Sequence, residues 1–116
     1  MGASPVLIDA GSHDRQLAWT SHLPQAVAYA LAGVLAKQGL TPPAFGNGAR
    51  DTTRLAASNP ELWIEIFLQN RDPLLEALDQ AGGALAVLRR LVECRDVEGM
   101  RDYLRAAADF RRGLER

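Results

Sequence analysis

Three short stretches of the chain carry side chains that could bind or polarise a small molecule. The first is "SHLP", in which His22 stands just before the apolar part of a predicted helix. The second is "GARDTTR", residues 48–54, which places two arginines beside a glycine-containing loop. The third is "NPELWIEIF", in which Trp63 lies in the first turn of another predicted helix. Each of the three stretches could contribute to a binding site, and each also has a structural explanation.

The two arginines, Arg50 and Arg54, are four residues apart, a spacing that places them on one helix face. A guanidinium fork matches a carboxylate or a phosphate through two parallel hydrogen bonds. The pair therefore predicts an anion clamp. The alternative is a surface ion pair between Asp51 and Arg54.

The "SHLP" segment combines a histidine with a helix breaker. Pro24 in a helix interior costs about 3 kcal/mol, because it lacks the donor for the carbonyl of Thr20. This cost indicates that a local distortion matters here. Ser21 and His22 are adjacent and diverge by about 100° around a helix, so they cannot form a nucleophile–base pair. His22 is either a structural histidine or a ligand-binding one, and Trp63 is either a core and interface residue or a ligand contact.

The elements that position these residues are predicted to be almost entirely helical. Apolar residues recur with helical spacing in each segment, which predicts an all-α fold of about five helices. We expect Ser12 to cap the first helix, Asp72 a later one and Asp96 the last, and Gly39 to end the first. The expected helices are 12–38, 51–57, one starting at Pro60 after Ser58 or Asn59, 72 to about 93, and one following Asp96, with an irregular loop over 39–49.

Two other sequence features are unusual for a helical protein: a short strand-like segment and a pair of glycines within a helix. Val6, Leu7 and Ile8 read as a short strand-like arm, yet a lone strand has nothing to pair with. Gly82 and Gly83 lie in mid-helix, where each costs about 1 kcal/mol relative to alanine. They are either a tolerated weakness or the point of a close helix–helix approach.

Composition narrows the functional classes. The net charge of -1 and the absence of a polybasic segment argue against nucleic-acid or membrane-surface binding. Cys94 is the only cysteine, so we expect no disulfide, and a reducing cytoplasmic location. No glycine-rich phosphate loop follows a strand, and the two histidines lack metal-ligand spacing. We therefore expect neither a cofactor site nor a metal site within this chain, and no complete catalytic set.

The motifs resemble a known family when they are taken in order. "HDRQLAWTSHLP" followed by "GARDTTRLAASNPELWIEIFLQN" is similar to the C-terminal helical domain of the prephenate/arogenate dehydrogenase family. In that family an "HD" precedes "SHLP" on the first long helix. A glycine-rich loop then leads to "RD-x-TR" and to "P-x-x-W", on a helix that ends in Asn. The resemblance covers nearly the whole chain.

This resemblance implies a fold, an activity and a set of site residues. The fold would be an intertwined dimerisation domain like the C-terminal domain of 6-phosphogluconate dehydrogenase. The activity would be NAD- or NADP-dependent oxidative decarboxylation of prephenate to 4-hydroxyphenylpyruvate, in tyrosine biosynthesis. Arg54 would pair with a substrate carboxylate, His22 would line the pocket, and Trp63 would reach the pocket of the other subunit. Asp51 would orient the arginine or the loop, and Arg50 is a weaker candidate.

The resemblance also implies that part of the enzyme lies outside this chain. Residues 1–11 would be the last strand and linker of a Rossmann domain, and residues 12–116 the helical substrate-binding and dimerisation domain. The dinucleotide loop and the family's catalytic histidine belong to that other domain, so we expect a homodimer that is inactive alone. Gln25 stands where many relatives carry a second histidine, which leaves prephenate and arogenate both open as substrate. The rival interpretation is a helical interaction module without catalytic function.

Overall fold

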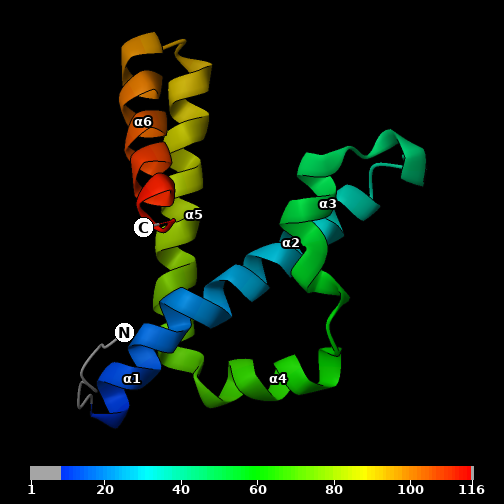
Figure 1. The fold of residues 1–116 in the computed structure, drawn as a ribbon, viewed down its shortest axis with the longest axis vertical. Helices are drawn as coiled ribbons and strands as arrows, with labels where there is room; N and C mark the ends of the chain where they lie inside the picture. The colour runs from blue at the N-terminus through cyan, green and yellow to red at the C-terminus, as the bar shows by residue number, and fades with distance from the viewer. Residues whose placement is uncertain (1–8, 116) are drawn as a thin grey trace. The chain divides into compact units, whose positions relative to one another are not determined.

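The computed structural model describes residues 9–115, and the elements over this range are helical. It divides into two compact units that meet at Leu78 and Asp79. We call residues 9–78 the site unit and residues 79–115 the hairpin, and describe each by itself (Figure 1). The all-α prediction is confirmed. The strand-like arm predicted at residues 6–8 lies outside the described residues.

The first long helix is continuous but not uniform. It consists of α1 (Ala10–Leu17), a π-helical turn (Ala18–His22) and α2 (Leu23–Ala36). Asp9 caps it, since its carboxylate accepts from the Ser12 backbone N–H at 2.9 Å. The prediction that Ser12 is the cap is wrong, because the carboxylate three residues earlier takes that role. Gly39 has a φ of 71°, the left-handed conformation expected where a helix has ended.

The segment after Gly39 is more regular than predicted. A 3₁₀ turn covers Pro42–Ala44, α3 covers Asn47–Thr53, and a second 3₁₀ turn covers Arg54–Ala57. The expected irregular loop over 39–49 and the helix boundary at Asp51 are therefore wrong. Proline is compatible with the first turn of a helix, and extended Gly46 caps α3 four residues earlier than predicted.

Two further helices follow with one residue between them. α4 (Pro60–Gln69) is capped by Asn59, whose side chain accepts from the Glu61 N–H at 3.0 Å. α5 (Arg71–Glu93) begins one residue before Asp72, so the prediction of Asp72 as N-cap is wrong. The carbonyl of Asn70 accepts from the Leu74 N–H at 3.0 Å and starts α5 instead.

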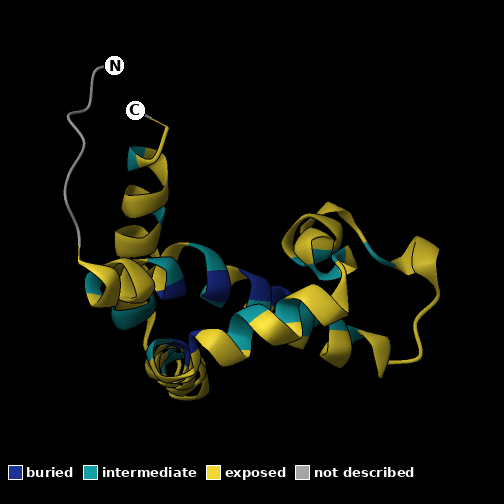
Figure 2. Ribbon diagram, turned by 90° about the horizontal axis from the view of Figure 1, so that it is seen from below, coloured by how far each residue is buried: buried dark blue, intermediate teal, exposed yellow. Residues whose placement is uncertain are grey.

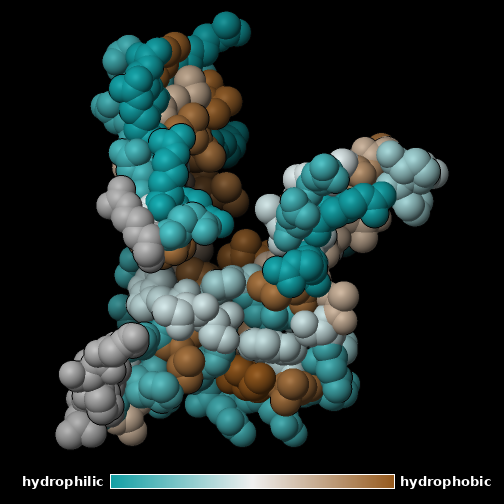
Figure 3. Space-filling model, viewed as in Figure 1, coloured by the Kyte–Doolittle hydropathy of each residue, from teal (hydrophilic) through white to brown (hydrophobic). Residues whose placement is uncertain are grey.

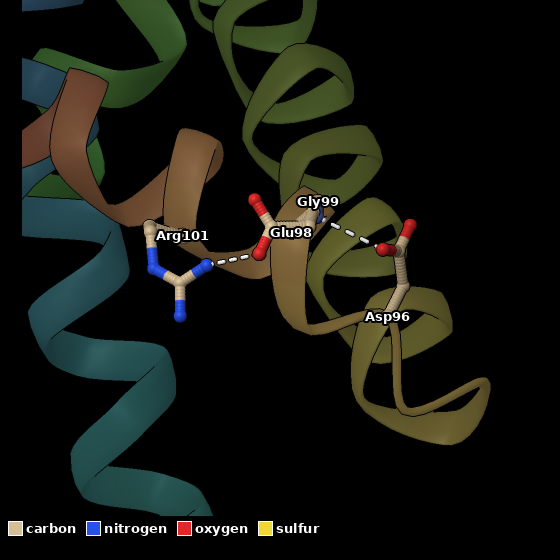
Figure 4. Close-up of polar contacts among 4 residues, drawn as sticks. All are labelled: Asp96, Glu98, Gly99 and Arg101. Atoms are coloured by element: carbon tan, nitrogen blue, oxygen red, sulfur yellow. Dashed lines mark hydrogen bonds and ion pairs between the residues drawn. The ribbon is translucent and has the colours of Figure 1, made fainter.

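The hairpin joins the C-terminal part of α5 to α6 (Val97–Gly113). Asp96 caps α6 as predicted, accepting from the Gly99 N–H at 2.9 Å, while Glu98 pairs with Arg101 one turn on (Figure 4). A methyl group at Gly99 would lie 2.5 Å from the Asp96 carboxylate and 2.7 Å from Leu91. A side chain at this position would therefore displace Asp96, whose carboxylate caps α6.

Burial differs between the units (Figure 2). The buried residues among those described all precede Asp79: Ala18, His22, Gln25, Ala28, Asn70, Leu74 and Ala77. Three of these seven residues are polar, which is a high proportion for a protein core. These three are therefore candidates for a functional role. No helix of the described range is long and apolar enough to cross a bilayer.

Candidate functional site

The π turn is the local feature that prepares the site. The Leu23 N–H bonds to the Ala18 carbonyl, five residues back, immediately before Pro24. A π turn of this kind is rare and is found disproportionately at functional sites. The distortion predicted from Pro24 therefore takes the form of one widened turn, and His22 is its last residue.

His22 is held in the site unit by an amide from a distant part of the chain. It is only 8% exposed, and its Nδ1 lies 3.0 Å from Nδ2 of Asn70. The same Asn70 nitrogen donates to the backbone carbonyl of Asp14 at 2.8 Å. One buried amide thus ties α1, the π turn and the α4–α5 junction together.

The next turns of α2 continue a polar row on the same helix face. Gln25 is 3% exposed and donates from Nε2 to the Leu55 carbonyl at 2.6 Å. Tyr29 donates from its hydroxyl to the Ser58 carbonyl at 3.1 Å. Residues 22, 25 and 29 follow helical spacing, and we call these three side chains the polar row. Two of them, Gln25 and Tyr29, hold the segment that contains Arg54.

Aromatic rings of α4 pack against the polar row. The Trp63 ring meets His22 edge-on, with centroids 6.2 Å apart, and lies 5.7 Å from Phe67. Phe67 in turn meets the Tyr29 ring edge-on at 6.5 Å. Trp63 is half-buried within its own chain, and the expectation that it reaches a second subunit stays a prediction.

The structure gives the two arginines different surroundings. Arg50 donates from Nε to the Phe45 carbonyl at 3.1 Å and from Nη2 to the Pro42 carbonyl at 3.0 Å. It therefore fastens the loop, and two of its five N–H donors are already engaged by backbone carbonyls. Arg54 is exposed, and its neighbour Leu55 is the residue that Gln25 holds. Arg54 is the better candidate for an anion.

Asp51 is exposed and takes part in no ion pair within residues 9–115. The alternative of an Asp51–Arg54 surface pair is therefore not realised in the described range. Nothing in the geometry assigns Asp51 an orienting role toward either arginine, and that role also stays a prediction.

Burial sets the electrostatics of the histidine. Desolvation lowers the pKa of His22 from its ordinary value of 6.5, and the nearby Asp14 carboxylate opposes this change. His22 is therefore the neutral imidazole near pH 7. A neutral imidazole beside an indole can donate a hydrogen bond to an oxygen of a ligand, and an exposed guanidinium can bind a carboxylate.

Comparison with known proteins agrees with the motifs. The sequence pattern of the prephenate dehydrogenase dimerization domain matches residues 9–106. This chain belongs to the prephenate dehydrogenase family. It is 37% identical over 114 residues to a cyclohexadienyl dehydrogenase of Zymomonas mobilis, and 33% identical over 106 residues to a prephenate dehydrogenase of Bacillus subtilis. These alignments cover 94% and 88% of this chain.

Solved structures of the prephenate dehydrogenase family share its fold. Prephenate dehydrogenase from Aquifex aeolicus, in complex with hydroxyphenyl propionate and NAD⁺, aligns with a TM-score of 0.83, 31% identity and 92% coverage of this chain. Arogenate dehydrogenase from Synechocystis aligns with a TM-score of 0.86, 30% identity and 94% coverage. The chain spans only 39% and 41% of those two structures, and 39% and 29% of the Zymomonas and Bacillus relatives. It corresponds to the dimerization domain of the family.

Sequence reasoning missed two of the residues that hold the site. Asn70 was noted only as the end of a helix, and Gln25 only as a departure from a family pattern. Both are buried and both bond to backbone carbonyls far along the chain, 56 and 30 residues away. A buried amide has no periodic signal of its own. The available hint was a polar residue, Gln25, three positions after His22 on an otherwise apolar helix.

Proposed function

We propose that this chain is the substrate-binding and dimerisation domain of a prephenate or arogenate dehydrogenase. The observation that carries the proposal is buried His22, held by Asn70 and placed against Trp63 in a segment widened by a π turn. A protein that used these helices only for association would have no need of a buried polar row. Such groups are costly to bury, and they are kept where they position chemistry.

In this proposal Arg54 binds a carboxylate of the substrate. Its guanidinium stays charged at any physiological pH and is exposed, while the backbone beside it is anchored by Gln25. An anchored, permanent cation suits an anionic substrate whose orientation must be fixed. In the same proposal His22 lines the substrate site, and Trp63 from this subunit or its partner supplies an apolar wall.

The hairpin serves dimerisation. Its apolar side chains stay exposed, including Leu85 at 69% and Phe110 at 70%. Figure 3 shows apolar residues gathered along the α5 side of the hairpin. Gly82, Leu85, Ala86, Leu88 and Val92 form one continuous face there. A second copy of the chain is the occupant that the dimerization family implies, and it would remove this face from water.

The same reasoning favours one of the two interpretations of Gly82 and Gly83. Apart from their own helix backbone, no atom of the described chain lies within 4 Å of a methyl group added at either glycine. In this proposal the close helix–helix approach belongs to the contact with the second copy, whereas without that contact the glycines are a tolerated weakness of α5.

The nicotinamide cofactor, NAD or NADP, is assigned to the part of the enzyme outside this chain. The described residues contain helices and connecting turns and no strand, so they offer no strand–glycine loop–helix unit for a pyrophosphate. We expect the isolated chain to lack dehydrogenase activity. Its single cysteine favours a location in the reducing cytoplasm.

A chimera tests the proposal. This chain would replace the corresponding domain of the Aquifex aeolicus enzyme, which matches 92% of it. The product is expected to be a dimer that reduces NAD⁺ with prephenate or with arogenate, and the ratio of the two rates identifies the preferred substrate. Removing the Arg54 guanidinium should abolish turnover while leaving the dimer intact.

The competing function is an interaction module. A chimera that dimerises and binds NAD⁺ but neither turns over nor binds prephenate or arogenate would contradict our proposal and favour that module. NAD⁺ binding and dimerisation are the controls that separate this result from misfolding.

A further inference from the structure

The side-chain amide of Asn70 contacts the atom that decides which ring nitrogen of His22 carries the proton. A backbone carbonyl oxygen can only accept a hydrogen bond, so the side-chain atom 2.8 Å from the Asp14 oxygen must be the amide NH₂. The same nitrogen lies 3.0 Å from Nδ1 of His22. An NH₂ group has two hydrogens and can serve both acceptors at once.

This geometry leaves one tautomer for the imidazole. Because Nδ1 faces a donor, it must present its lone pair, and the ring proton of neutral His22 must be on Nε2. Nε2 has no hydrogen-bond partner within residues 9–115, and no buried side-chain nitrogen or oxygen of that range is left unpaired. Nε2 therefore reaches the molecular surface, where a ligand can meet it.

We propose that Asn70 is a positioning residue that fixes His22 as the Nε2–H tautomer, with that N–H available to an oxygen of the bound substrate. Three contacts support this role: the Asp14 carbonyl orients the amide, the amide orients the ring, and Trp63 packs edge-on against the ring. The substrate part of this statement rests on the proposed function. The tautomer part does not.

The surroundings of the ring favour the same state. The charged group that acts on His22 is the Asp14 carboxylate from α1, whereas α4 contributes the uncharged Trp63 ring. Protonation at Nδ1 would place a donor against the Asn70 donor. The amide therefore adds to burial in keeping the ring neutral, and the site offers a donor from His22 rather than a second cation.

The tautomer can be measured by ¹⁵N NMR on the 116-residue chain without any ligand. Long-range proton–nitrogen spectra separate a ring nitrogen with a lone pair from one that carries hydrogen, and His13→Gln identifies the signals of His22. A hydrogen bond of ordinary net strength should give the Nε2–H form an excess of at least about fivefold. A predominant Nδ1–H form in the wild-type chain would overturn the proposal.

Variants separate positioning from a general structural effect. In Asn70→Asp the carboxylate can only accept, so the tautomer should reverse to Nδ1–H and the pKa of His22 should rise. Tyr29→Phe is the matched control, because it removes a hydrogen bond from the same polar row without touching the ring. It should leave the tautomer unchanged. An Asn70→Asp chain that is folded and keeps the wild-type tautomer would also overturn the proposal, and the wild-type measurement decides the matter if that variant does not fold.

Adding hydroxyphenyl propionate to the chimera separates this inference from the proposed function. A shift of the His22 Nε2–H signal supports both. An Nε2–H tautomer that no substrate analogue perturbs would leave Asn70 as the group that sets the tautomer, but it would contradict the role in substrate binding. Binding of the analogue together with an Nδ1–H tautomer would contradict the positioning role alone.

Discussion

The site unit and the hairpin bury their residues in different ways. The site unit buries three polar side chains and four apolar ones, and each buried polar group has a partner. The hairpin buries none of its described residues and exposes large apolar side chains, including Leu85, Val92 and Phe110. The part of α5 after Leu78 and the whole of α6 contain no buried residue. This unit therefore gains little stability from its own packing, because folding free energy comes chiefly from apolar burial. In our proposal the site unit carries substrate specificity, and the hairpin depends on a second copy of the chain.

The largest expected effect concerns the open face of the hairpin. Leu85→Glu would place a charge at the centre of the proposed contact, where desolvation without a partner is severe. We expect the dimer dissociation constant to rise by at least about 100-fold. Sedimentation equilibrium measures it. Gln80→Glu is the control, since it adds the same charge to an exposed position of the same helix outside that face. Equal dissociation constants for the wild type and Leu85→Glu would show that this face is not the interface.

The polar row of the site unit should be the next most sensitive feature. Gln25→Leu removes the donor to the Leu55 carbonyl at a buried position, and should lower the free energy of unfolding by about 1–3 kcal/mol. Gln38→Leu removes a comparable amide bond, to the Val34 carbonyl at 2.9 Å, at an exposed position. It should change stability by no more than about 0.5 kcal/mol. Urea denaturation of the two variants compares them directly, and equal losses would contradict the view that burial makes the difference.

The turn of the hairpin shows that this unit is closely packed locally even though it is open on its faces. Gly99→Ala would push a methyl group into Asp96 and Leu91, disturb the α6 cap and cost about 1 kcal/mol. Gly33→Ala is its counterpart in the site unit, because nothing lies within 4 Å of a methyl group there. It should stabilise α2 by about 0.5–1 kcal/mol. Thermal unfolding midpoints should therefore move in opposite directions, and a shift of the same sign in both variants would be inconsistent with the packing described here.

The smallest effect is a pH dependence confined to the site unit. Burial lowers the pKa of His22, so the folded chain binds this proton less readily than the unfolded chain does. The contribution of His22 to stability is complete above its ordinary value of 6.5 and declines as the pH falls below it. Unfolding free energies measured from about pH 7.5 to about pH 5.5 should decrease in the wild type and flatten in His22→Gln. His13→Gln, which changes the exposed histidine, should keep the wild-type slope; loss of the slope in this variant instead would contradict the assignment.

The sequence predicted the elements better than their boundaries. Helical periodicity identified the helical segments, Asp96 was recognised as a cap, and Asn59 was one of the two candidates for the cap of α4. Ser12 and Asp72 were not caps, because another group close by, the Asp9 carboxylate or the Asn70 carbonyl, took that function. Competition between neighbouring polar groups is settled by local geometry, which residue types alone do not specify.

The residue types of the candidate site could be predicted from the sequence, but the hydrogen bonds that they form could not. His22, Arg54 and Trp63 follow from residue chemistry and from the family motifs. The different roles of Arg50 and Arg54 could not be predicted from the sequence, because they depend on which backbone carbonyls of the loop accept hydrogen bonds from Arg50. The His22–Asn70 contact joins residues 48 positions apart, a distance over which no periodic pattern operates.

The most direct test of the account is the affinity of the chimera for hydroxyphenyl propionate, measured by calorimetry with and without Arg54. Losing a charge-assisted bidentate contact should weaken binding by about 10- to 100-fold in Arg54→Ala. Arg112→Ala, which removes an exposed arginine of the hairpin outside the proposed dimer face, should bind like the unmodified chimera. Unchanged affinity in the Arg54→Ala chimera would contradict the claim that the site unit binds the substrate through this residue.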